Sequence, residues 1–188
     1  MKAKGQANLQ RIVEAANTLF YHQGFNQTSF AEVAEASGIP KGNFYYYFKS
    51  KDELLAAVVE LRLEGIRQML ADWQTEFAEP KQRLKRFAQI LLNEVDDVLR
   101  YGCPMGSLTV ELSKTQLALQ SKAKEMFALF LDWLEQQLED LGKGDQARPL
   151  ALHLLAMTQG IALISNAYAD RRFLQQEVTR LDAWIDQL

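Results

Sequence analysis

The chain has 188 residues, enough for one domain or two small ones with a substantial hydrophobic core. Acidic residues exceed basic residues by 24 to 21, and a net charge of −3 by itself argues against a nucleic-acid partner. A single cysteine excludes an intramolecular disulfide, and the polar first residues (MKAKG) do not resemble a secretory leader, so we expect a cytoplasmic protein.

The composition favours helices over strands. Leucine and alanine together number 50, against 22 for valine, isoleucine and threonine, which prefer strands. Apolar residues recur at helical spacing between the four prolines, and each proline suits the first turn of a helix. We therefore predict an all-α protein of about nine helices.

The first three predicted helices form a compact head. They cover about residues 7–22, 30–36 and 41–48. The second begins with the capping box formed by Ser29 and Glu32 and ends at Gly38. This organisation predicts a head over 1–52 and a larger helical body over 53–188.

A fourth helix is predicted to begin with a second capping box, formed by Ser50 and Glu53, and to continue to about Trp73. The helices expected after it lie at about 81–101, 104–114, 116–141, 148–169 and 175–187. Residues 150–169 carry no Asp, Glu, Lys or Arg, but polar side chains interrupt the segment and no second such segment follows. We therefore predict no membrane span, and expect this helix to be buried between the body and a second subunit.

Charge is divided unevenly between the two parts. Residues 1–51 contain six basic and three acidic residues, whereas the remainder contains 15 basic and 21 acidic residues. Lys41 and Lys51 each fall in the first turn of a predicted helix, where the helix dipole disfavours a cation. A bound phosphate would compensate for that cost, so the head is expected to bind an anion.

The third predicted helix is rich in aromatic residues. Phe44 and Phe48 are four residues apart and suit the core, which leaves some of the three intervening tyrosines exposed to donate hydrogen bonds. Gly42 permits close approach to a groove, and Asn43 has the donor and acceptor pair that reads adenine. Two helices joined by the Gly38–Pro40 turn predict a helix-turn-helix.

Residues 28–34 (TSFAEVA), 36–48 (ASGIPKGNFYYYF) and 50–54 (SKDEL) resemble the DNA-binding head of the TetR family of bacterial transcriptional repressors. The resemblance implies a homodimer whose third helices enter successive major grooves of double-stranded DNA. It also implies a divergent body that binds a small molecule and releases the DNA. Tyr47 stands where the family often has histidine, and Pro40 stands where it often has a serine or threonine cap.

The resemblance carries DNA-binding roles to individual residues. It implies that Thr28 and Ser29 cap the second helix beside the DNA backbone, and that Lys51 clamps a phosphate. The residues expected at or in the groove are Lys41, Gly42, Asn43, Tyr45, Tyr46 and Tyr47.

The body offers candidate contacts for a largely apolar effector. The residues predicted to line its pocket are Trp73, Phe87, Met105, Phe127, Phe130, His153 and Met157. Cys103 precedes Pro104 and lies at or beside a helix N-cap, where a thiol can become reactive, so a redox or electrophile sensor acting through Cys103 is the alternative function. The two histidines and one cysteine provide no metal-site spacing, and no cofactor or catalytic residue is predicted.

Dimerisation is predicted through residues 150–188. The last helix carries an apolar stripe that could join helix 150–169 in a four-helix bundle between subunits. The stripe consists of Leu174, Val178, Leu181, Trp184, Ile185 and Leu188. A helical carrier without DNA binding would also explain the body, but it would leave the head lysines and tyrosines unexplained. We therefore predict a cytoplasmic DNA-binding repressor without catalytic activity.

Overall fold

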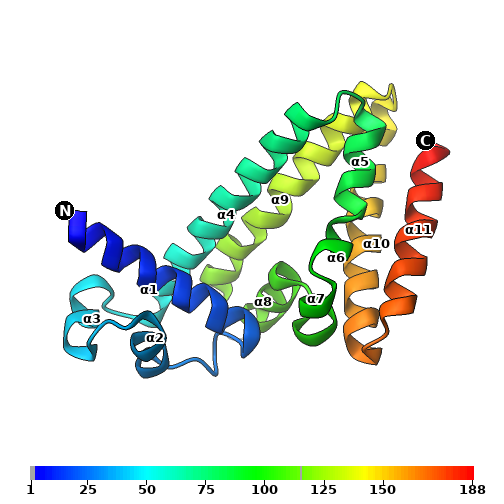
Figure 1. Ribbon diagram of the computed structural model, residues 1–188. Helices are drawn as coiled ribbons and strands as arrows, with labels where there is room; N and C mark the ends of the chain where they lie inside the picture. The colour runs from blue at the N-terminus through cyan, green and yellow to red at the C-terminus, as the bar shows by residue number, and fades with distance from the viewer. Residues whose placement is uncertain (1–2, 115) are drawn as a thin grey trace. The chain divides into compact units, whose positions relative to one another are not determined.

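The computed structural model describes residues 3–114 and 116–188, without the side chains of Ala3 and Lys41. Within these residues all regular structure is helical, which confirms the predicted all-α fold (Figure 1). Packing divides the chain into two compact units, Met1–Glu64 with Ser107–Met126, and Gly65–Gly106 with Phe127–Leu188. The head and body division at residue 52 remains a prediction from the sequence.

The first unit contains α1 (Ala3–His22), α2 (Phe30–Ser37), α3 (Lys41–Tyr47) and the beginning of α4 (Lys51–Glu76). Its apolar core includes Ile12, Phe20, Phe25, Val33, Phe44 and Leu54. Phe44 and Phe48 are both buried, as their spacing predicted. The side chain of Arg62 on α4 donates to Asn17 Oδ1 on α1 at 2.7 Å, which fastens these two helices together.

The ends of α2 follow from local sequence. Ser29 Oγ accepts from the backbone N–H of Glu32, whose carboxylate accepts in return from the Ser29 N–H, so the predicted capping box is present. Gly38 ends the helix at φ 65°, a left-handed conformation that glycine adopts without steric cost. The predicted box at α4 is only partly formed. Ser50 Oγ accepts from the Glu53 N–H, but the Glu53 carboxylate accepts from the backbone N–H of Lys49 instead of that of Ser50.

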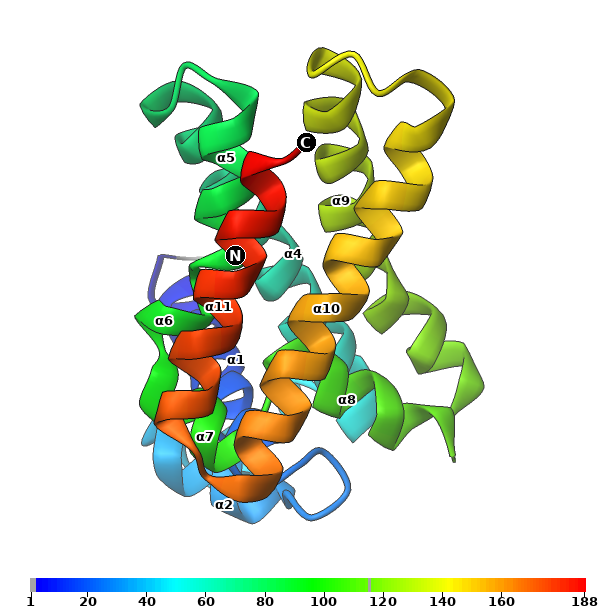
Figure 2. The same ribbon diagram turned by 90° about the vertical axis from the view of Figure 1, so that its right-hand side faces the viewer.

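The single helix predicted over 81–101 is wrong. The segment forms three helices, α5 (Pro80–Ala88), α6 (Ile90–Asn93) and α7 (Val95–Tyr101). No glycine or proline marks the breaks at Gln89 and Glu94. The segment packs first along α11 (Arg171–Asp186) and then along α10 (Ala147–Tyr168), so tertiary packing explains its change of direction (Figure 2).

The remaining helices are α8 (Pro104–Ser113), α9 (Leu117–Asp140) and a 3-10 turn, η1 (Gly144–Gln146), before α10. The segment from Gly144 to Tyr168 is long and apolar enough to cross a membrane by length and composition. However, α10 packs against α7 and α11 and buries one face that includes Leu154, Thr158, Ile161 and Ser165. This face makes α10 a core helix of the second unit.

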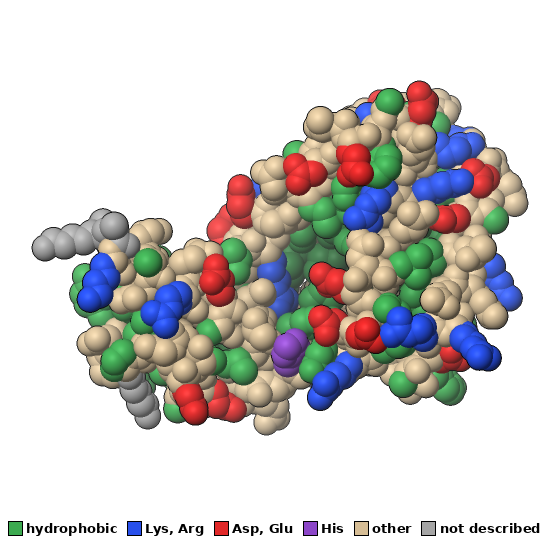
Figure 3. Space-filling model, in the orientation of Figure 1, with side chains coloured by type: hydrophobic (Ala, Val, Ile, Leu, Met, Phe, Trp, Pro, Cys, Tyr) green, Lys and Arg blue, Asp and Glu red, His purple; other side chains and the backbone are tan. Residues whose placement is uncertain are grey.

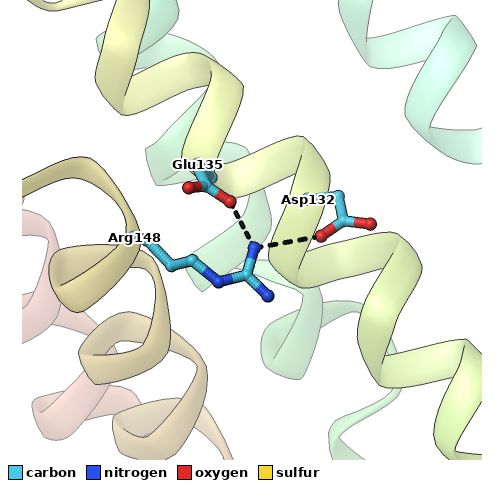
Figure 4. Close-up of polar contacts among 3 residues, drawn as sticks. All are labelled: Asp132, Glu135 and Arg148. Carbon is cyan, nitrogen blue, oxygen red and sulfur yellow. Dashed lines mark hydrogen bonds and ion pairs between the residues drawn. The ribbon is translucent and has the colours of Figure 1, made fainter. Parts of the chain in front are cut away.

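Polar contacts fasten the helices of the second unit. Arg148 on α10 forms ion pairs with Asp132 and Glu135 on α9 (Figure 4). The hydrogen bond that the guanidinium donates to Glu135 is the main cause that raises the pKa of Arg148. Over α5, α7 and α11, acidic and basic side chains are interspersed on the surface (Figure 3). Among them, Lys85 Nζ lies 2.6 Å from Asp186 Oδ1. Exposed pairs of this kind contribute little stability each.

The buried Arg83 of α5 caps the C-terminal end of α4. Its guanidinium donates to the carbonyl oxygens of Gln74, Phe77 and Ala78 and to Gln137 Oε1, at 2.7–3.3 Å. These carbonyls lie at or just beyond the C-terminal turn of α4, where helix carbonyls lack helical partners. Among the described residues, Arg83 therefore satisfies the carbonyl groups at the end of α4 without pairing with a carboxylate.

Candidate nucleic-acid interface

The first unit contains the predicted helix-turn-helix. After Gly38, Pro40 occupies the N-cap of α3 with φ −53°, and its carbonyl oxygen accepts from the Asn43 N–H at 2.8 Å. Proline supplies no side-chain cap, so α3 begins without the hydroxyl contact that serine or threonine would provide. Behind the turn, Arg11 of α1 donates to the Ser37 carbonyl at 2.6 Å and holds the end of α2.

One side of α3 is buried and the other is exposed. Phe44 is 1% exposed and its ring lies 4.7 Å from that of Phe30 on α2, measured between centroids. In contrast, Tyr46 is 74% exposed and Tyr45 is 48% exposed, and Gly42 and Asn43 are exposed on the same short helix. A Cβ placed at Gly42 would meet no atom within 4 Å, so its immediate surroundings are open.

Tyr47 occupies a different position from the other two tyrosines. It is half-buried, and its hydroxyl accepts a hydrogen bond from Asn8 Nδ2 at 3.2 Å. This contact ties the end of α3 to the beginning of α1. The Tyr47 hydroxyl retains its own proton, which it can donate elsewhere.

Thr28 and Ser29 lie at the entrance to α2 but face different surroundings. Ser29 is exposed and caps α2, whereas Thr28 is 1% exposed and donates from its hydroxyl to the Gly24 carbonyl at 2.7 Å. The structure therefore groups Ser29 with the surface residues but places the Thr28 side chain inside the loop. Hydrogen bonds from the Ser29 hydroxyl, the Ser29 backbone and Gln23 lower the pKa of Glu32, which completes the cap.

Lys51 does not point freely into solvent. Its ammonium donates to the carbonyl oxygens of Phe25, Asn26 and Thr28 at 2.9, 3.2 and 3.1 Å. It also lies 4.5 Å from the centroid of the Phe25 ring. The predicted phosphate contact of Lys51 remains a prediction, while the predicted contact of the Lys41 side chain falls outside the described residues.

The predicted effector residues are only partly brought together. Phe87 and Phe130 are buried with ring centroids 5.4 Å apart, and buried Trp73 lies near Trp133 with centroids 5.8 Å apart. Met105, Phe127 and Met157 are half-buried. His153 is exposed, and the centroid of its ring lies 5.4 Å from that of Trp184, so it does not join the buried aromatic residues.

Cys103 directly precedes α8. Its sulfur accepts from the Gly106 N–H at 3.4 Å, in the first turn of α8. This contact is a structural capping interaction. Neither the geometry nor the comparisons below support the alternative of a redox or electrophile sensor at Cys103.

Reasoning from the sequence missed Glu111. Its carboxylate accepts from the backbone N–H groups of Phe25 and Asn26 at 3.0 and 2.7 Å. The partners are 86 and 85 residues away along the chain, and no local motif links them. Only the folded first unit reveals this contact.

Known families match most of the chain. Residues 12–58 match the model "Bacterial regulatory proteins, tetR family", and residues 62–179 match "Transcriptional regulator LmrA/YxaF-like, C-terminal domain". The regulator LmrA of Bacillus subtilis is 30% identical over 162 residues, which cover 83% of this chain and 85% of LmrA.

Solved structures share the fold. A TetR transcriptional regulator from Legionella pneumophila is 26% identical with a TM-score of 0.82, and the match covers 94% of each chain. The regulator FadR from Bacillus subtilis, solved in complex with stearoyl-CoA, has a TM-score of 0.71 at 19% identity, with 94% of this chain and 96% of FadR covered. The chain therefore belongs to the TetR family of DNA-binding transcriptional regulators, and its C-terminal part is of the LmrA/YxaF-like type.

Proposed function

We propose that this protein is a cytoplasmic homodimeric repressor that leaves its operator DNA when a small, largely apolar effector binds, and that it acts by binding rather than by catalysis. The observation that carries the DNA-binding part is the exposed face of α3. Tyr45, Tyr46 and Asn43 are exposed together on a helix anchored from behind by buried Phe44. Large side chains exposed next to one another on a surface often mark an interaction site.

The chemistry of this face suits DNA. Tyrosine hydroxyls can donate to phosphate oxygens, and asparagine can pair with an adenine edge. Lys49, at the C-terminal side of α3, is exposed and donates to the Tyr45 carbonyl at 2.7 Å, so a cation adjoins the tyrosines. We propose that α3 enters the major groove with Gly42, Asn43, Tyr45 and Tyr46, and that lysines of the head other than Lys51 contact phosphates.

The proposed dimer uses α10. Leu152, Leu163, Ile164 and Tyr168 are 51%, 66%, 41% and 77% exposed on this helix. Most of the apolar stripe predicted on α11 is instead buried within the second unit. Leu174, Val178, Leu181 and Ile185 are buried, and α11 packs against α5, α6 and α10 of that unit. The exposed apolar face of α10 therefore supports an interface between two copies within 150–188.

The proposed effector site lies in the C-terminal part of the chain. The partly buried Met105, Phe127 and Met157 are of the flexible or aromatic type that lines apolar pockets, and Phe87 and Phe130 provide adjoining aromatic surface. FadR, which shares the fold, was solved in complex with stearoyl-CoA. An effector releases DNA if it binds better to a dimer whose α3 helices no longer match grooves about 34–36 Å apart.

The test is a DNA-binding titration. Purified protein is titrated against a fluorescent duplex from the region upstream of its own gene, over a series of salt concentrations. We expect binding at low salt, with the logarithm of the association constant falling linearly against the logarithm of salt concentration. Absence of binding at low salt, or binding that does not depend on salt, would contradict the proposal and favour a helical carrier.

A further inference from the structure

The Gly24–Thr28 loop, which joins α1 to α2, is held by opposite charges from two sides. The Glu111 carboxylate accepts the N–H groups of Phe25 and Asn26. The Lys51 ammonium donates hydrogen bonds to the carbonyl oxygens of Phe25, Asn26 and Thr28. Two consecutive residues thus have their donors and their acceptors bonded to ionised groups.

The geometry leaves little freedom at this loop. Gly24 has φ +89°, and a Cβ there would lie 3.3 Å from Glu111 Oε2, so both its conformation and the close approach of Glu111 favour glycine. The Phe25 side chain is fully buried and its ring meets that of Phe20 edge-on, with centroids 5.2 Å apart. The loop is therefore anchored by its side chain as well as by its backbone.

The hydrogen bonds that Lys51 already donates argue against its acting as a phosphate ligand. An ammonium has three N–H donors, and three carbonyl oxygens lie within 3.2 Å of Lys51 Nζ. A phosphate contact would require at least one of these bonds to open. The contact between Nζ and the Phe25 ring further holds the side chain over the loop.

We propose that Lys51 and Glu111 form a two-sided clamp on the Gly24–Thr28 loop, and that this clamp positions α2 and α3 for DNA binding. Both are positioning residues and neither contacts DNA. The loop runs directly into the Ser29 cap of α2, which packs on α1 and carries α3, so displacement of the loop displaces the DNA-binding face. The consequence for DNA rests on the proposed function, whereas the clamp itself can be tested without DNA.

The first experiment measures amide hydrogen exchange in the full-length protein. Glu111→Gln keeps the shape of the side chain but removes its charge. We expect the Phe25 and Asn26 amides to exchange about tenfold faster or more, because hydrogen bonds to charged acceptors are among the strongest in proteins. Amides in the middle of α1 should keep their protection. Unchanged exchange at both loop amides would overturn the clamp, whether or not the protein binds DNA.

The second experiment asks whether removing the negative charge of Glu111 raises or lowers DNA affinity. Removing an acidic charge from a DNA-binding unit ordinarily raises affinity for a polyanion. The clamp predicts the reverse for Glu111→Gln, about a tenfold loss. Glu35→Gln is the matched control, because Glu35 is exposed on α2 and its side chain forms no hydrogen bond with another described residue. It should leave affinity unchanged or raise it. A gain in affinity for Glu111→Gln would contradict the proposal.

The third experiment separates positioning from phosphate contact at Lys51. Lys51→Gln should weaken DNA binding while the slope of log affinity against log salt stays as in the unchanged protein. A lost phosphate ligand would instead reduce that slope by about 1. The double variant should lose less affinity than the two single losses combined, because both residues hold the same loop. A reduced slope, or fully additive losses, would overturn the clamp. If the unchanged protein binds no DNA, the proposed function fails and hydrogen exchange alone decides the clamp.

Discussion

The α3 and α10 helices both expose tyrosine and other large side chains, but in different electrostatic surroundings. On α3, Tyr45 and Tyr46 stand beside Asn43 and Lys49, in a segment of the chain with an excess of basic residues. On α10, Leu163, Ile164 and Tyr168 lie within the run 150–169, which has no Asp, Glu, Lys or Arg. Exposed aromatic area alone does not identify a partner, whereas the neighbouring charge distinguishes DNA from a second protein copy.

This difference predicts that a substitution on one face leaves the function of the other unchanged. The exception is that loss of the dimer also weakens DNA binding, because DNA binding requires two heads. A variant on α10 should first alter the oligomeric state and, through it, DNA affinity. A variant on α3 should alter DNA affinity alone. The predictions below test this separation, beginning with the largest expected effect.

The largest effect is expected from Leu163→Asp on α10. An aspartate placed in an apolar interface would be buried without a partner, and losses at such positions reach about 2–4 kcal/mol, or about thirtyfold to several hundredfold in dimer dissociation. Sedimentation velocity should show monomers at concentrations where the unchanged protein is dimeric. DNA affinity should fall with it, because each monomer presents a single α3.

Val110→Asp is the matched control for this change. Val110 is 59% exposed on α8, a similar exposure to that of Leu163, and the substitution introduces the same charge. It should leave the dimer intact. If Val110→Asp dissociates the dimer and Leu163→Asp does not, the α10 interface is wrong.

A smaller effect is expected from Tyr46→Ala on α3. Loss of one hydrogen bond to a charged phosphate and of the ring contact should reduce DNA affinity about tenfold, or about 1.4 kcal/mol. Because Tyr46 is 74% exposed, thermal stability and dimerisation should not change. Tyr46→Phe separates the two contributions, since it removes only the hydroxyl. Equal affinity for all three proteins in an anisotropy titration would exclude Tyr46 from the DNA interface.

The smallest effect concerns the Glu32 cap of α2. The Ser29 hydroxyl, the Ser29 N–H and Gln23 lower the pKa of Glu32 in the folded protein. The cap therefore stabilises the fold at pH values above the ordinary glutamate pKa, and this stability is lost as pH falls through the lowered value. Thermal unfolding should show Glu32→Gln to be slightly less stable at neutral pH and equal to the unchanged protein in strong acid.

Glu35→Gln on the same helix removes no cap and serves as the control for this pH series. A stability difference for Glu32→Gln that persists unchanged into strong acid would show that ionisation of Glu32 does not support the cap.

Local signals in the sequence predicted much of the head. The α2 boundaries follow from Ser29, Glu32 and Gly38, and the burial of Phe44 and Phe48 follows from their spacing of four residues. These features depend on neighbours within one or two helical turns. The exposure of Tyr45 and Tyr46 follows from the same geometry, since a short helix cannot bury all its sides.

Features set by long-range packing could not be predicted. The breaks at Gln89 and Glu94 arise where one segment passes from α11 to α10, and no residue type marks them. The hydrogen bonds of Glu111 join residues about 85 positions apart, so their partners emerge only on folding. The place of Lys51 in the first turn of a helix predicts an anion ligand, but this pattern does not show that three carbonyl oxygens lie within reach of its ammonium.

The central claim is that two copies of this chain bind one operator through two α3 helices. Sedimentation of the protein with a duplex from its upstream region measures this most directly, because it gives the number of chains bound to each DNA molecule. Two chains for each operator are expected, together with two protected half-sites about one helical turn apart in a footprint of the same complex. A complex with one chain and a single protected site would contradict the account.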